Sequence, residues 1–186
     1  MQGRSQLAEF LSEIDPHLAI RVRREVFEEG WVDGFVVGTG PEFFALALLD
    51  DGMRPNGFSC MRYADLTELE APSPRDGFLR QVLELRGLSV VGELPADLAD
   101  LPALLRSAGN AFPLVTIHLE AEEADAYYVG HAPTVAGSEV SLRTIDPDGV
   151  WDEGTDTFDL AAITRVDFGG AYEEALWLVG EQGLED

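Results

Sequence analysis

The chain has 186 residues, 46% of them apolar and 25% charged, so it is long enough and apolar enough to fold around its own core. Its twelve basic residues are all arginines, and 35 Asp and Glu residues give a net charge of -23. Such a chain cannot neutralise a row of phosphates, so nucleic acid and anionic membrane surfaces are excluded as expected partners.

Apolar spacing predicts one helix and then a run of short strands in the first half. Leu7, Phe10, Leu11 and Ile14 lie at helical spacing over residues 5–14. The period then changes to two, which is typical of half-buried strands. We expect strands from residue 18 and over residues 31–38, 43–49, 58–63 and 66–69, with a helix from residue 78.

The second half repeats this order. Tyr127–Gly130 matches Phe35–Gly38, and both runs follow a pair of glutamates. The turn at residues 146–149 corresponds to the turn at residues 50–52, and residues 163–167 align with residues 66–70. Because several features recur in one order, we interpret the halves as copies of one unit.

A helical stripe of leucines lies between the two copies, and Pro102 interrupts it. We therefore expect two short helices or a kinked one there. The predicted fold is a β-rich α+β chain of two tandem small β-barrels, each ending in a short helix. The first barrel and the N-terminal helix take residues 1–92, a helical linker takes 93–110, and a second, acidic barrel takes 111–186.

The strand pattern resembles the Sm-like small barrels found in many short bacterial proteins. The resemblance covers the strand from Ile20, the Gly34–Gly38 strand and the Asp65–Leu69 stretch, with Tyr127–Gly130 and Ile163–Val166 in the second copy. It implies the barrel fold, and for the family it implies rings that bind RNA. The turns at residues 38–41 and 50–52 lack the family's Asp-Asn and Arg-Gly signatures, so we carry over the fold and not the RNA function.

The densest group of carboxylates follows the strand near residue 145. Calcium favours such oxygen ligands, but Gly149 is the fourth residue from Asp146, where the helix-loop-helix calcium motif needs its glycine sixth. We therefore prefer a hairpin turn and predict no metal and no cofactor. The weak metal candidates are Asp146, Asp148, Asp152, His118 and His131, the last two as a pair if their strands are adjacent.

The single cysteine and one tryptophan are further candidates for function. Cys60, the single cysteine, lies in a strand with no histidine near it in the sequence, so we expect a buried structural thiol. Trp151 is flanked by acidic residues, and the sequence leaves two roles open for it: a position in the core, or an exposed anchor for a partner protein. The predicted partner-binding residues are Trp151, Asp152, Glu153 and Asp156.

The functional prediction rests on the distribution of charge along the chain. Residues 93–186 hold 20 carboxylates and 3 arginines, so a partner drawn by charge should be a basic protein. We expect a cytoplasmic, non-catalytic interaction module, in its sharpest form an immunity or inhibitor protein for a basic nuclease. The alternatives are a metal-dependent hydrolase that uses residues 146–159, and a structural subunit that forms a homodimer.

Overall fold

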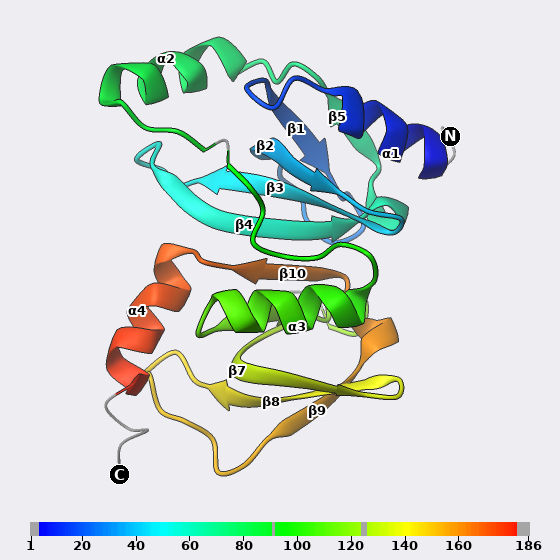
Figure 1. Ribbon diagram of the computed structural model, residues 1–186, viewed down its shortest axis with the longest axis vertical. Coiled ribbons are helices and arrows are strands. Elements are labelled where there is room, and N and C mark those ends of the chain that lie inside the picture. The colour runs from blue at the N-terminus through cyan, green and yellow to red at the C-terminus, as the bar shows by residue number, and fades with distance from the viewer. Residues whose placement is uncertain (1–3, 91, 124–125, 182–186) are drawn as a thin grey trace. The chain divides into compact units, whose positions relative to one another are not determined.

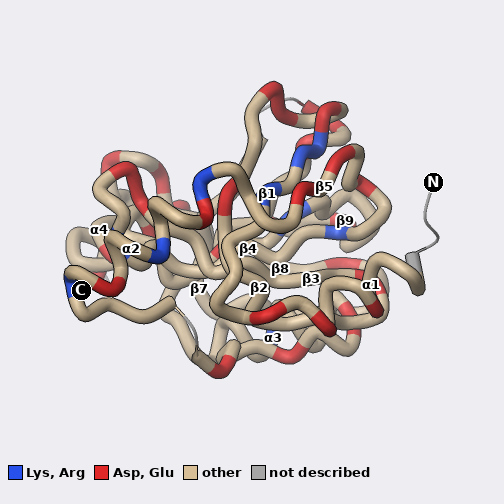
Figure 2. The backbone as a smooth tube through the Cα atoms, turned by 90° about the horizontal axis from the view of Figure 1, so that it is seen from above, with Lys and Arg blue, Asp and Glu red and all other residues tan. Residues whose placement is uncertain are grey.

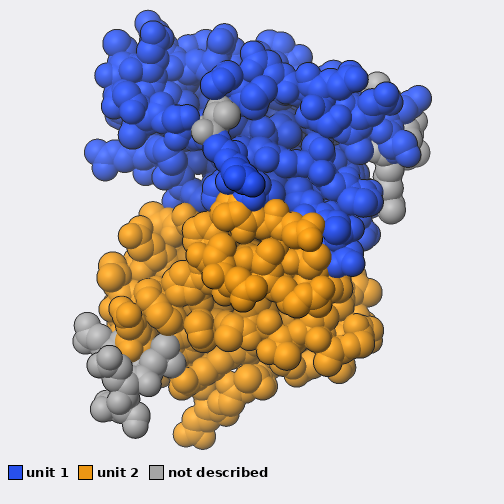
Figure 3. All heavy atoms as spheres, in the orientation of Figure 1, with its two compact units in different colours: residues 1–94, 98–100 blue, residues 95–97, 101–186 orange. Residues whose placement is uncertain are grey.

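The computed structural model describes residues 4–90, 92–123 and 126–181, and the chain divides into two compact units (Figure 3). Unit 1 comprises residues 1–94 and 98–100, and unit 2 comprises residues 95–97 and 101–186. Both units have the same element order: a helix, four strands, a 3-10 turn, a fifth strand and a closing helix (Figure 1).

Most elements of both units lie close to where the apolar periodicity places them, whereas the strand at residues 156–159 was not expected. Those of unit 1 are α1 (Arg4–Glu13), β1 (Ala19–Arg23), β2 (Val32–Thr39), β3 (Phe43–Leu49), β4 (Pro55–Arg62), η1 (Tyr63–Asp65), β5 (Glu68–Glu70) and α2 (Asp76–Arg86). Those of unit 2 are α3 (Leu101–Ala111), β6 (Val115–His118), β7 (Tyr127–Ala136), β8 (Glu139–Ile145), β9 (Asp156–Asp159), η2 (Leu160–Ala162), β10 (Arg165–Phe168) and α4 (Ala171–Gly180).

The predicted barrels are wrong, because the strands form open antiparallel sheets. The order is β5-β1-β2-β3-β4 in unit 1 and β10-β6-β7-β8-β9 in unit 2. A barrel needs a ladder between its first and last strands. Among the described strands, none joins β5 to β4 or β10 to β9. The expected Sm-like barrel is wrong for the same reason. Side chains alternate equally in an open sheet and in a barrel, so periodicity does not report closure.

The expected helical linker is also corrected. The helix of this region, α3, packs against β6 and β7 and is therefore an element of unit 2. Pro102 is the second residue of α3. A backbone N–H in the first turn has no acceptor within the helix, so proline loses no hydrogen bond there and the helix continues without interruption. Gly109 lies inside α3 and allows a close approach, since an added Cβ would be 2.6 Å from Pro133 Cδ on β7.

Unit 1 has a core on each face of its sheet. One core packs α1 on the sheet and includes Leu11, Phe44 and Met61. The other, thinner core packs α2 on the opposite face and includes Phe35 and Leu79. Residues 43–47 of β3 are therefore buried on both sides. Cys60 is fully buried, as the sequence predicted.

Unit 2 buries a small core between its sheet and α4. Leu114, Val129, Ile145 and Leu176 form this core, and Trp151 and Trp177 pack against it.

Among the described residues, no helix has the length and the apolar character needed to cross a lipid bilayer.

Candidate functional site

The acidic segment after β8 begins as a tight turn. Asp146 Oδ1 accepts hydrogen bonds from the backbone N–H groups of Asp148 (2.9 Å) and Val150 (2.8 Å). Gly149 has a φ of 81°, the left-handed conformation that glycine adopts most easily. One carboxylate oxygen of Asp146 thus accepts two backbone hydrogen bonds within the turn, and the hairpin turn is confirmed.

Two other carboxylates of this segment meet at one threonine. The buried hydroxyl of Thr144 is 2.7 Å from Asp152 Oδ2 and also hydrogen-bonds Asp156 Oδ2. Glu153 is exposed between them in the sequence. Within the described parts of the chain, no three His, Cys, Asp or Glu side chains gather in a way that could hold a metal ion.

The histidines predicted as a pair lie apart. His118 is opposite Tyr127 in the β6–β7 ladder, and His131 is four residues further along β7. Four residues of strand span about 13 Å, so the two rings do not form one site. His131 instead packs on Trp177, with ring centroids 5.3 Å apart, and its Nδ1 donates to the carbonyl of Pro113 (2.7 Å).

His118 belongs to a half-buried charged network. Its Nε2 lies 2.9 Å from Asp167 Oδ2, and Arg165 bonds both oxygens of the same carboxylate (2.9 and 2.7 Å). Burial would raise the pKa of Asp167, but the charge of Arg165 and the hydrogen bond from His118 outweigh it. They hold the pKa of Asp167 well below its ordinary value, so Asp167 is ionised at neutral pH.

Trp151 is half-buried. Its Nε1 donates to the carbonyl of Gly180 (2.7 Å), its ring meets Trp177 edge-on, and the guanidinium of Arg143 lies 5.1 Å from its centroid. Trp151 therefore fixes α4 to the sheet. Its role in partner binding, with Asp152, Glu153 and Asp156, remains a prediction.

An exposed apolar surface lies over α4. Leu178 is 61% exposed, Val179 58% and Tyr172 44%. Tyr127 is hydrogen-bonded to Tyr172, and Gly149 touches Val179, so the turn with exposed Val150 continues the surface. We call these five residues, Tyr127, Val150, Tyr172, Leu178 and Val179, the α4 surface.

Carboxylates border the α4 surface. Burial comes first among the effects that raise the pKa of Tyr172, followed by the bond with Tyr127 and the charges of Glu173 and Asp146. Glu174 and Asp148 are exposed on α4 and in the turn. Glu173 also accepts a hydrogen bond from Thr116 (2.6 Å), which holds its carboxylate beside the sheet.

Acidic residues dominate the chain as a whole. In Figure 2, Asp and Glu recur along the tube, whereas the arginines gather in a few places that include β1. In unit 1, ion pairs join arginines to nearby carboxylates, as in Arg21–Glu70 and Arg80–Asp76. The border of the α4 surface, with Glu174 and Asp148 exposed, carries negative charge.

Comparison with protein-family models, curated proteins and solved structures finds no match. Geometry and charge must therefore carry the functional proposal. The signal for the α4 surface was already present in the sequence. Apart from Glu173 and Glu174, residues 171–180 are apolar or glycine, which is more than one covered stripe needs, and the surplus apolar residues Leu178 and Val179 are exposed.

Proposed function

We propose that this chain is a protein-interaction module whose α4 surface binds a basic, amphipathic segment of a partner protein. The observation that carries the proposal is the exposed apolar side of α4. A helix normally buries one apolar stripe against the protein and presents a polar face to water. Here Leu176 is buried on the inner side, while Leu178 and Val179 are apolar and more than half exposed on the outer side.

Charge selects the partner. An apolar patch bordered by carboxylates is complementary to a segment with apolar residues on one side and Lys or Arg at its edges. Asp148 and Glu174 lie at the rim, where they would speed encounter rather than supply most of the affinity. A second copy of the chain carries the same negative charge, so repulsion opposes self-association through this surface.

A calorimetric titration tests the proposal. The probe is a synthetic leucine–lysine peptide with helical spacing, and its counterpart has glutamate in place of lysine. We expect the lysine peptide to bind more weakly as salt rises, and the glutamate peptide not to bind. The double variant Leu178→Ser and Val179→Ser should lose at least about tenfold in affinity, because exposed apolar residues at the centre of an interface dominate its energy.

Leu85→Ser supplies the matched control. Leu85 is 80% exposed on α2 of unit 1, so its change removes comparable apolar surface outside the proposed site. Equal weakening by the two changes would mean that the peptide binds this acidic protein without using α4, and would refute the proposal. Light scattering of the free protein tests whether a second copy of the chain occupies the α4 surface instead. A dimer that the same double change abolishes would show self-association through this surface and would overturn the proposed basic partner.

A further inference from the structure

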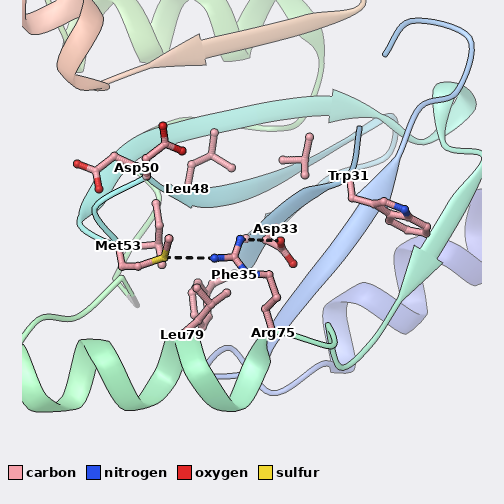
Figure 4. Close-up of a pocket in the computed structure, with 12 residues that line it drawn as sticks. Trp31, Asp33, Phe35, Leu48, Asp50, Met53, Arg75 and Leu79 are labelled. Atoms are coloured by element: carbon pink, nitrogen blue, oxygen red, sulfur yellow. Dashed lines mark hydrogen bonds and ion pairs between the residues drawn. The ribbon is translucent and has the colours of Figure 1, made fainter. Parts of the chain in front are cut away.

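Unit 1 contains a cavity of about 250 Å³ on the face of the sheet that α2 covers. Phe35 supplies an apolar wall from β2 and Leu79 supplies one from α2 (Figure 4), and Leu49 adds to it from the end of β3. Because Asp33 and Phe35 are two residues apart on β2, their side chains share a face of the sheet. The cavity therefore combines an apolar wall with a carboxylate.

Negative charge predominates in the lining of this cavity. Asp33, Asp50 and Asp51 line it together with one arginine, Arg75. Asp50 Oδ1 accepts the backbone N–H of Arg54 (2.9 Å), so this carboxylate is fixed in the β3–β4 turn. Three carboxylates against one guanidinium in the lining favour a cationic ligand over an anionic one.

Asp33 is oriented for binding a cation. Its side chain is 19% exposed, and the hydroxyl of Ser73 donates a hydrogen bond to Oδ1. This bond comes from the segment before α2 and fixes the carboxylate against the cavity. A carboxylate that is held in place and shielded from water pairs more strongly with a cation than a mobile, exposed one.

Arg75 reaches across the same space in the free protein. Its guanidinium lies 3.5 Å from Asp33 Oδ2 and 3.7 Å from Met53 Sδ, and the side chain is 48% exposed (Figure 4). Both contacts are at the long end of the ranges for an ion pair and a sulfur contact. Arg75 is therefore loosely held, and the cost of moving it is small.

We propose that this cavity binds an organic cation, a guanidinium or ammonium group on an apolar body, which displaces Arg75 and pairs with Asp33. The cation takes the position of the Arg75 guanidinium, and its apolar part packs on Phe35 and Leu79. The same chemistry is available from a free amine or from a basic side chain of a protein. The proposal uses residues of unit 1 and does not depend on the α4 surface.

Titration with benzamidine, followed by calorimetry and by amide chemical shifts, tests this site. We expect wild-type protein to bind benzamidine, with shifts at Phe35, Met53 and Leu79, and not to bind benzoate or neutral benzamide. Arg75→Gln should bind at least about tenfold tighter, because the internal competitor is gone. Arg54→Gln removes the same charge from the neighbouring turn and should have a much smaller effect.

Asp33→Asn should abolish binding while circular dichroism shows an intact fold. If this variant does not fold, the shift map of the wild type and the Arg75→Gln affinity still decide the matter. Benzamidine binding without shifts at the cavity, preference for benzoate, or equal affinity in Arg75→Gln and wild type would overturn the proposal.

An acetylated Gly-Arg-Gly amide distinguishes the two sources of the cation. If it binds more tightly than free agmatine, the site is assigned to a protein side chain, and the reverse order assigns it to a free amine.

Discussion

At the scale of single residues, arginines pair with carboxylates at positions that are fully or partly shielded from water. Arg24 is fully buried and pairs with Glu28 (2.9 Å), and Arg165 pairs with Asp167, two residues further along β10. An ion pair that is shielded from water loses hydration but gains Coulomb attraction, and removing one partner leaves an uncompensated charge. The contribution of such a pair to the free energy of unfolding therefore changes with pH, in the direction that the pKa shift of its carboxylate sets.

Asp167→Asn tests the charged network of unit 2. The folded-state pKa of Asp167 lies below its ordinary value, so ionised Asp167 stabilises the fold above about pH 4 and loses this contribution as pH falls below that range. We expect the variant to lose about 2 kcal/mol of unfolding free energy at pH 7, and the difference from wild type to narrow at pH 3. Urea unfolding at both pH values measures it.

Asp148→Asn is the matched control, because Asp148 is exposed in the turn after β8. Its unfolding free energy should stay within about 0.5 kcal/mol of wild type at either pH. An Asp167→Asn deficit that is the same at pH 3 and pH 7 would show that its charge is not what stabilises the fold.

Tyr63 predicts a change at alkaline pH. Its side chain is 2% exposed, and burial raises the pKa of Tyr63 to about 12. Because the folded state holds this proton more tightly than the unfolded state, stability should fall as pH rises from about 10 to 12. Tyr63→Phe should lose less stability than wild type over this interval, whereas Tyr128→Phe, at an exposed position, should follow wild type.

At the scale of elements, the sequence predicted most strands and helices but not how they assemble. Periodicity located α1, β3 and β8 within a residue or two, because each buries regularly spaced apolar side chains. It missed β9, whose four residues, Asp-Thr-Phe-Asp, are mostly polar and pair with β8 at the edge of the described sheet. Local pattern holds no information on whether the outer strands meet.

The candidate site was predicted less well than the elements. The hairpin turn at Gly149 followed from local chemistry. His118 and Asp167 are 49 positions apart in the sequence, so their pairing depends on the register between β6 and β10, and nothing local encodes it. The α4 surface could have been found, because Leu178 and Val179 fall outside the stripe that a covered amphipathic helix needs.

Two helical glycines give a paired prediction. Gly109→Ala would place a Cβ 2.6 Å from Pro133 Cδ, so close packing of α3 on β7 should outweigh the better helix propensity of alanine. We expect a loss of about 1–3 kcal/mol. Gly77→Ala in α2 meets no atom within 4 Å and should be neutral or stabilising by up to about 1 kcal/mol. Thermal unfolding that ranks the two the other way would contradict this packing.

At the scale of the whole molecule, the net charge of -23 dominates. Repulsion among like charges opposes a compact fold, while exposed ion pairs contribute up to about 1 kcal/mol each. Since carboxylates outnumber arginines almost threefold, screening should relieve more repulsion than attraction. We expect the unfolding temperature to rise between about 10 and 150 mM NaCl, and a fall would mean that the ion pairs prevail.

Nuclear magnetic resonance with the leucine–lysine peptide tests the proposed function most directly. Amide shifts in ¹⁵N-labelled protein should concentrate in residues 171–179, in the turn at 146–150 and at Tyr127, and should disappear in the Leu178→Ser, Val179→Ser variant. Shifts spread evenly over the acidic residues of both units, or unchanged in that variant, would contradict a binding role for the α4 surface.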